Sequence, residues 1–326
     1  MASLVYIFLL IVGSYTNSCN VEAANIFVSS VYGEGSHFLA ASAIGQRLIA
    51  RGHNVTFLIS SAYYEHRAKN PKFSNFSYEV FKHPIPDHEV REMFKTLNSL
   101  AFVDQDKQFM EMMKLVSKRM ADDCELLLSD KQFESRLEGF DAIMLDIAWP
   151  CGLLIREILR RNENSVAMIA FTPTPPWSGF LSASGSSFNY AYQTEMTTGL
   201  PNNMTFAQRL YNLCYSTFVA ALAEFFFYAP YSEIGKRLGF PDIHFVHSYS
   251  DFDLHLTNVD FASEFIYPLA PNVFPVGGLT VAAPALLGKV HGPELSQQPT
   301  NSRGKYDAYN RSHDGTRTTH EGNTKM

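Results

Sequence analysis

The sequence lacks the features that define several large classes of protein. Its 326 residues include 26 Lys and Arg against 32 Asp and Glu, and a net charge of −6 gives no reason to expect nucleic acid as a partner. The chain contains no Gly-x-Ser-x-Gly, no Walker loop, no Gly-x-Gly-x-x-Gly and no His-Glu-x-x-His. These absences argue against a serine hydrolase, a phosphate-binding loop, a dinucleotide fingerprint and a zinc-protease helix, and we expect no metal site.

Long hydrophobic runs are also missing. The first run, residues 4–12, has nine apolar residues, which is too short to span a bilayer. Polar residues follow it, and Val21-Glu22-Ala23 then gives a small-residue cleavage pattern. We therefore interpret residues 1–23 as a secretory signal peptide, although no Lys or Arg precedes the run; a buried N-terminal strand is the alternative.

The most apolar long segment lies much later, at residues 213–228. Glu224 interrupts it, and its length is again below that of a transmembrane helix. The segment predicts a buried or amphipathic helix. A peripheral contact with a membrane surface is the less favoured alternative.

Cysteine is scarce, with four in the chain. Cys19 falls within the predicted signal peptide, which leaves Cys124, Cys151 and Cys214. Their spacing is typical of neither a zinc site nor a disulfide framework. We expect three buried free thiols; one disulfide with one free thiol is the alternative in an oxidising compartment.

The chain does contain a repeated alternation of strand and helix. In residues 24–59 a short apolar run is broken by Gly33-Glu34-Gly35, a helix follows over 37–51, and Gly52 ends it before a second strand at 54–59. Later segments continue this order, with strands expected at 78–81, 140–146, 166–171 and 255–258, a last element at 272–279, and helices at 60–71, 90–128 in two pieces and 153–161. The pattern predicts an α/β fold, a Rossmann-like parallel sheet flanked by helices.

Two side chains invite a catalytic interpretation. His37 lies in the first turn of the helix that follows the first strand, and Asp146 ends a later strand of the same sheet. Both are expected at the carboxyl edge of the sheet, where open α/β sheets bind their ligands. A histidine with a carboxylate on its far nitrogen is a general base. The alternatives are a solvent-bonded helix residue for His37 and a helix cap for Asp146.

Several large side chains are candidates for lining a pocket for apolar ligands. Phe109, Met112 and Met113 recur at helical spacing, and methionine adapts its shape to varied ligands. Trp177 ends a proline-rich loop after a buried strand, and Phe225 lies in the apolar segment 213–228. Each of them, taken singly, is more typical of a core than of a pocket.

Four sequons mark acceptors for N-glycosylation. Asn75 and Asn203 lie in polar, loop-like surroundings and are the expected sites. Asn54 begins a predicted strand and is discounted; Asn310 belongs to residues 289–326, whose polar composition predicts a disordered tail.

Several short segments, in order along residues 24–287, resemble animal UDP-glycosyltransferases of the glucuronosyltransferase type. The stretch from Pro268 to Val273, followed by Val276-Gly277-Gly278-Leu279, is the most specific of them. The others are Gly35-Ser36-His37, residues 51–56, residues 140–146, Pro150-Cys151-Gly152, residues 204–212 and residues 258–261.

This resemblance implies a GT-B fold, in which two Rossmann-like domains face each other across a cleft. The N-terminal domain binds the acceptor, and residues 24–288 would correspond to it. His37 would remove the proton of a hydroxyl on a small lipophilic acceptor, and Asp146 would orient His37. The oxygen would then attack a UDP-sugar, UDP-glucuronate or UDP-glucose, and invert its anomeric carbon.

The chain departs from the family after this point. It lacks the family's Trp/Cys-Pro-Gln stretch, the His-Gly-Gly loop of the donor site, and the C-terminal membrane helix with its basic tail. We therefore expect no cofactor bound by this chain and no turnover by the chain alone. It would act in the endoplasmic reticulum lumen or be secreted. The alternatives are a non-catalytic module that binds acceptors or pairs with full-length relatives as a homo- or hetero-oligomer, and a fragment without function.

Overall fold

A computed structural model describes residues 23–100, 106–161, 166–195, 198–240, 244–262, 264 and 266–281. The described residues as far as Thr280 belong to one compact unit. Residues 1–22 of the predicted signal peptide, Asn310 and the predicted polar tail lie outside the described residues. Within the described ranges, no helix is long and apolar enough to cross a membrane.

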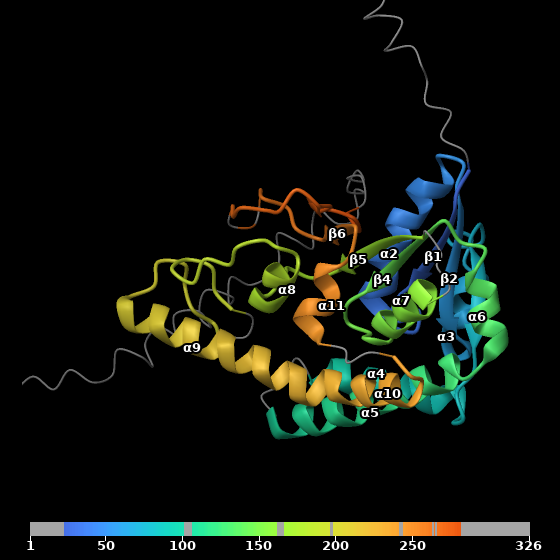
Figure 1. Cartoon of the computed structure of the whole chain (residues 1–326), viewed down its shortest axis with the longest axis horizontal. Coiled ribbons are helices and arrows are strands. Elements are labelled where there is room, and N and C mark those ends of the chain that lie inside the picture. The colour runs from blue at the N-terminus through green and yellow to red at the C-terminus, as the bar shows by residue number, and fades with distance from the viewer. Residues whose placement is uncertain are drawn as a thin grey trace, which may run out of the picture. The chain divides into compact units, whose positions relative to one another are not determined.

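A parallel sheet of seven strands forms the centre of the domain (Figure 1). The strand order is β3-β2-β1-β4-β5-β6-β7, and every neighbouring pair is parallel. The predicted parallel sheet is thus confirmed. The bounds are β1 Asn25–Ser29, β2 Asn54–Ser60, β3 Ser77–Phe81, β4 Ala142–Asp146, β5 Ala167–Thr172, β6 Leu254–Thr257 and β7 Val273–Pro275.

The order of pairing reverses at the centre of the sheet. The chain first builds outward from β1 through β2 to β3, and then returns to place β4 on the other edge of β1. In β1, Phe27 pairs with Thr56 of β2 on one side and Ile143 of β4 on the other. The carboxyl ends of β1 and β4 therefore meet at the switch point, which is where this class of sheet binds ligands.

Helices cover both faces of the sheet. In Figure 1, α4, α5 and α10 lie together along one side of the domain, while α2 lies away from them beside β1. The bounds are α2 Gly35–Ile49, α3 Ser61–Ala68, α4 Asp87–Leu100, α5 Asp106–Leu128, α6 Lys131–Leu137, α7 Cys151–Arg161, α8 Ser178–Ala183, α9 Phe206–Ala223, the π-helical turn η1 Glu224–Tyr228, α10 Ala229–Arg237 and α11 Phe245–Ser250.

Two hydrophobic cores follow from the alternation of side chains along the strands. Ile26, Val28 and Met144 point to the core that α2 covers, whereas Phe27 and Ile143 point to the larger core of the opposite face. Because both faces are buried, the strands read as continuous apolar runs in the sequence rather than as alternating ones.

The expected helix at residues 213–228 differs from prediction. α9 begins earlier, at Phe206, where Thr205 and Gln208 form a capping box, and it continues into the π-helical turn η1. Of the two predicted forms, buried or amphipathic, the fully buried one is wrong, because Leu213 and Phe218 are exposed and Phe225 is 78% exposed. Among the described elements, α8 and η1 pack against α9, and several of its apolar side chains remain exposed.

The expectation of three buried free thiols is also wrong. Cys124 of α5 and Cys151 of α7 form a disulfide, with 5.6 Å between their Cα atoms. Cys214 is free and exposed. A separation of 27 residues in the sequence could not indicate this pairing, because it arises from the packing of α5 against the start of α7.

Candidate functional site

The turn between β1 and α2 has an unusual backbone. Tyr32, Gly33 and Gly35 have φ values of 56°, 83° and 52°, in the left-handed region that residues with a Cβ rarely adopt. At Gly33 a Cβ would also lie 2.5 Å from Cγ1 of Ile59, so only glycine fits there. Glu34 closes the turn with an extended backbone, and α2 starts directly after it. The turn thereby places His37 in the first helical turn.

His37 and Asp146 meet at the switch point of the sheet. Nδ1 of His37 donates to Oδ2 of Asp146 over 2.7 Å, and the other carboxylate oxygen accepts the backbone N–H of Ala148 at 2.9 Å. The Asp146 side chain is 1% exposed and the His37 side chain is 27% exposed. A carboxylate can only accept, so Nδ1 carries the proton and Nε2 is left to accept one.

The electrostatic surroundings adjust the basicity of His37. Burial by itself lowers the pKa of this imidazole, but the charge and hydrogen bond of Asp146 and the charge of Glu34 outweigh it, so the pKa is raised above 6.5. Glu34, at the end of the turn, has a raised pKa because it is partly buried. The pair can therefore take up a proton and stabilise the resulting imidazolium.

We expect Asp146→Asn to lower the pKa of His37, because the lowering effect of burial is then no longer opposed by the charge of Asp146. Because the pKa of His37 is higher in the folded than in the unfolded chain, its protonation stabilises the wild-type fold. This stabilisation is complete at pH values below the unfolded pKa of about 6.5, and it disappears as the pH rises through the folded pKa. The variant should lose that pH dependence. A nuclear magnetic resonance titration of the His37 ring measures the pKa, and an unchanged or higher value in the variant would contradict the assignment.

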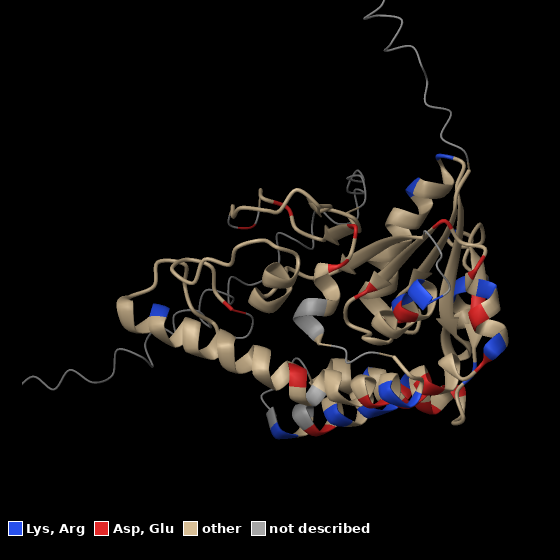
Figure 2. Ribbon diagram, viewed as in Figure 1, with Lys and Arg blue, Asp and Glu red and all other residues tan. Residues whose placement is uncertain are grey.

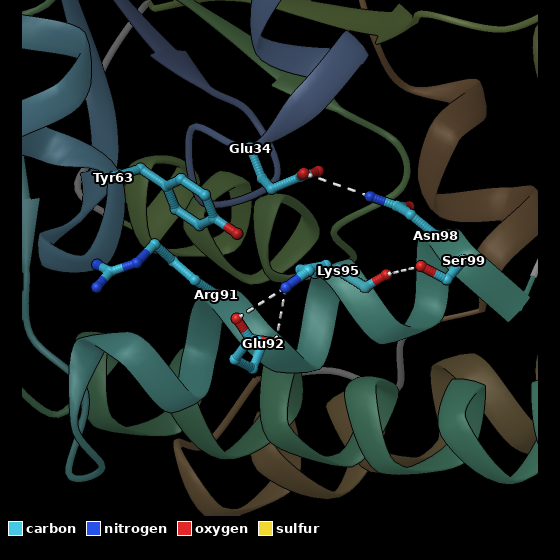
Figure 3. A pocket seen from close by; sticks show the side chains of 7 residues that line it. All are labelled: Glu34, Tyr63, Arg91, Glu92, Lys95, Asn98 and Ser99. Atoms are coloured by element: carbon cyan, nitrogen blue, oxygen red, sulfur yellow. Dashed lines mark hydrogen bonds and ion pairs between the residues drawn. The ribbon is translucent and has the colours of Figure 1, made fainter.

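A cleft of about 600 Å³ opens beside the turn. Figure 3 shows Glu34 at its upper wall pointing toward Asn98 of α4, with the ring of Tyr63 between Glu34 and Arg91. Nδ2 of Asn98 lies 3.4 Å from a carboxylate oxygen of Glu34. Glu92, Lys95 and Ser99, also on α4, complete the lining. The cleft thus lies between Glu34, the residue before α2, and the polar side of α4.

The predicted pocket residues are dispersed. Met112 and Trp177 are half-buried and pack against the larger core, and Met113 is half-buried on α5. Phe225 is exposed on η1, and Phe109 lies on α5 with a side chain outside the described residues. None of these five residues is among the described residues that line the cleft. The proposed glycosylation sites Asn75 and Asn203 are both exposed.

Sequence reasoning missed a second polar cluster. Ser60, His83 and Asp123 come from β2, the loop after β3, and α5, and their side chains are joined by hydrogen bonds. No motif or spacing links positions 60, 83 and 123, so no signal in the sequence could have found this cluster. In the described part of the chain, no group of three His, Cys, Asp or Glu residues could hold a metal ion.

Comparison with known proteins places most of the chain in one family model. Residues 27–296 match the model described as "UDP-glucoronosyl and UDP-glucosyl transferase". UDP-glucuronosyltransferase 1A1 of Rattus norvegicus is 26% identical over 260 residues, which cover 76% of this chain and 45% of the relative. UDP-glucuronosyltransferase 2B7 of Homo sapiens is 27% identical over 256 residues, which cover 76% of this chain and 47% of the relative. The chain therefore spans about half the length of the relatives it matches.

Solved structures overlay only in part. The overlap with the glycotransferase of kitacinnamycin covers 83% of this chain and 54% of that structure's chain, at 13% identity and a TM-score of 0.42. The overlap with TcCGT1 in complex with UDP covers 86% of this chain and 56% of that structure's chain, at 15% identity and a TM-score of 0.42. These overlaps are too loose to carry an argument about function.

Proposed function

Because the chain belongs to the family of UDP-glucuronosyl and UDP-glucosyl transferases, we propose that its sheet domain binds a hydroxyl acceptor and supplies the base for glycosyl transfer. The observation that carries this proposal is the hydrogen bond of 2.7 Å between His37 and Asp146 at the switch point. A partly exposed base backed by a buried carboxylate is the arrangement that activates a hydroxyl group.

In the proposed reaction, Nε2 of His37 accepts the proton of the acceptor hydroxyl. The oxygen forms a bond to the anomeric carbon of the UDP-sugar as the bond from that carbon to the UDP oxygen breaks, and UDP leaves with the electron pair. Attack from the side opposite to UDP inverts the anomeric carbon. Asp146 stabilises the imidazolium that forms. UDP-glucuronate is the favoured donor because the relatives are glucuronosyltransferases by name; UDP-glucose is the alternative.

We propose that the domain is the acceptor-binding half of a GT-B enzyme and needs a donor-binding half for turnover. The sheet and its helices belong to one compact unit, and the chain spans about half the length of its relatives. A base removes little from the barrier unless the activated sugar is held against the acceptor oxygen. The 326-residue chain alone would thus bind acceptor without transferring sugar.

The test compares the chain alone with the same chain fused to the donor half of a full-length relative, using radiolabelled UDP-glucuronate and a panel of phenols and steroids. We expect calorimetric binding of at least one acceptor by both proteins, and transfer by the fusion alone. Robust transfer by the chain alone would overturn the half-enzyme proposal. Absence of both binding and transfer would overturn the acceptor assignment.

A second candidate function is that of a module that pairs with full-length relatives. The observation that favours it is the uncovered apolar side of α9 and η1, where Phe206 is 82% exposed and Leu210, Phe218 and Phe225 are also exposed. Figure 2 shows that α9 is almost free of charged residues, in contrast to α4 and α5. Such a surface is typical of a contact with another chain or with a membrane.

Co-expression with a full-length relative tests the pairing. The chain should co-purify with the relative, and the double substitution Leu210→Asp/Phe218→Asp should abolish this. Failure to co-purify, with no change in the activity of the relative, would remove the pairing proposal. Binding to phospholipid vesicles instead would assign the surface to a membrane.

We propose that the chain enters the secretory pathway and acts in the endoplasmic reticulum lumen or after secretion. The disulfide between Cys124 and Cys151 supports an oxidising compartment, and Asn75 and Asn203 are accessible to glycosylation. A loss of mass after enzymatic removal of N-glycans would support this location, and an unglycosylated, reduced chain isolated from cells would contradict it.

A further inference from the structure

A buried network of hydrogen bonds lies behind the turn that carries His37. Oγ of Ser60 donates to Nε2 of His83 over 2.5 Å, and Nδ1 of His83 donates to Oδ2 of Asp123 over 2.9 Å. Arg119, one turn earlier on α5, binds the same carboxylate through two nitrogens. The serine, histidine and aspartate have the order of a hydrolase triad, but the His83 and Asp123 side chains are 0% exposed. No substrate reaches them, so the network is not a nucleophile site.

Tyr32 connects this network to the turn. Its hydroxyl donates to Oδ2 of Asp123 over 2.5 Å, and its backbone carbonyl accepts the N–H of Ser60 at 3.0 Å. The residue is fully buried and has a φ of 56°, a conformation that is unfavourable for a side chain of this size. A residue stays in such a conformation only where its surroundings determine it. The bond to Asp123 and the packing of the ring supply that constraint five residues before His37.

The same helix also holds the segment that follows Asp146. Trp149 donates from Nε1 to the backbone carbonyl of Met120 at 3.2 Å, and its ring meets the ring of Tyr32 edge-on at 5.2 Å. Two residues later, Cys151 is joined to Cys124. One stretch of α5 therefore anchors both the turn that leads to His37 and the segment that leaves Asp146.

We propose that Tyr32 and Trp149 are positioning residues, which fix the separation of His37 and Asp146 by anchoring both catalytic segments to α5. The inference rests on the proposed function, because it assigns these residues a role in preparing the same base. Neither side chain touches the reacting atoms; each acts through the backbone of its segment. A displacement of about 1 Å at such a site can cost about 100-fold in rate, so a rigid anchor has a direct effect on catalysis.

Core packing alone would explain why the ring of Tyr32 is buried, but not why its hydroxyl bonds to Asp123. Tyr32 makes edge-on or tilted contacts with Phe81, His83, Phe94 and Trp149. These rings would still surround a phenylalanine at position 32. The hydroxyl adds a single bond, and that bond goes to the carboxylate that Arg119 and His83 already hold in place. Removing the hydroxyl therefore separates anchoring from core packing.

The experiment uses Tyr32→Phe in the full chain with isotope-labelled histidine, and it reads the pKa of the His37 ring by nuclear magnetic resonance. We expect this pKa to fall by about half a unit or more, because a looser turn weakens the bond to Asp146. The matched control is Tyr192→Phe, which removes a hydroxyl that donates to the carbonyl of Ile266 at 3.3 Å, in the segment between α8 and α9. The control should leave the pKa of His37 unchanged.

Trp149→Phe is a second variant, which removes the bond to Met120 and should lower the pKa of His37 in the same direction. In the fusion with a donor half, both variants should lower kcat about tenfold or more with little change in the acceptor KM. A His37 pKa that stays at the wild-type value in both folded variants would overturn the proposal, even if their melting temperatures fall. The titration needs no turnover. If the pKa of His37 falls in the variants but the wild-type fusion transfers no sugar, the positioning role of Tyr32 and Trp149 is supported and only the proposed function is contradicted.

Discussion

In a fusion with a donor half, His37→Ala lowers kcat by about 10²- to 10⁴-fold, the range that a general base contributes. We expect the variant to retain acceptor binding, because the imidazole acts on the proton of the acceptor hydroxyl. Alanine favours the helix, and the ring it replaces is partly exposed, so α2 keeps its packing. Kinetics over a range of acceptor concentrations and a thermal melt measure both effects.

Two further variants separate the loss of a base from other effects. His37→Gln retains a donor for the carboxylate of Asp146, which is 1% exposed and costly to leave unpaired, yet it supplies no group of comparable basicity. It should be nearly as inactive as the alanine variant. His66→Ala changes an exposed histidine on α3 and should have wild-type kinetics. Wild-type activity in His37→Gln would contradict the role of His37 as the base.

Removal of the disulfide has the largest expected effect on stability. Cys124 and Cys151 are fully buried and lie 27 residues apart, and a cross-link of that length restricts the unfolded chain by roughly 3–4 kcal/mol in the loop-entropy model. The double substitution Cys124→Ala/Cys151→Ala should therefore lower the free energy of unfolding by about that amount. Urea titrations of the two proteins under the same conditions measure the difference.

Cys214 offers the matched control, because it is free and exposed on α9. Cys214→Ala should change the free energy of unfolding by less than about 0.5 kcal/mol. A reductant should destabilise the wild-type chain and leave the double variant unaffected. Equal stability of the wild-type and double-variant chains would contradict the disulfide as a stabilising link.

The sheet could be predicted from the sequence because its signal is local. Apolar runs such as 26–28 and 143–145 identify strands that are buried on both faces, and Gly33, Gly35 and Gly52 identify the ends of the elements between them. The approach of His37 to Asp146 followed from one further rule, that parallel strands place their carboxyl ends at one edge. The structure brings the two side chains within hydrogen-bond distance.

The remaining features depend on tertiary packing and have no local signal. The pairing of Cys124 with Cys151 results from how α5 packs against α7, and the contact of His83 with Asp123 joins a loop to a helix. Methionine spacing on α5 predicted an apolar face but could not show that Val116 and Met120 enter the core. Whether α9 is buried or exposed stayed open in the sequence for the same reason, since hydrophobicity alone does not show which neighbours pack against a helix.

The placement of β4 beside β1 has a consequence for how the domain matures during synthesis. The partner of β1 on one edge, β2, follows closely in the chain, whereas Asp146 emerges 109 residues after His37, roughly 5–20 s later at typical translation rates. During that interval the nascent sheet has an open edge at β1, which is open to pairing with other chains and to chaperones. The insertion of β4 closes this edge and brings the carboxylate to the imidazole in the same event. A newly made chain therefore completes the proposed base in the same step that covers the open edge of β1.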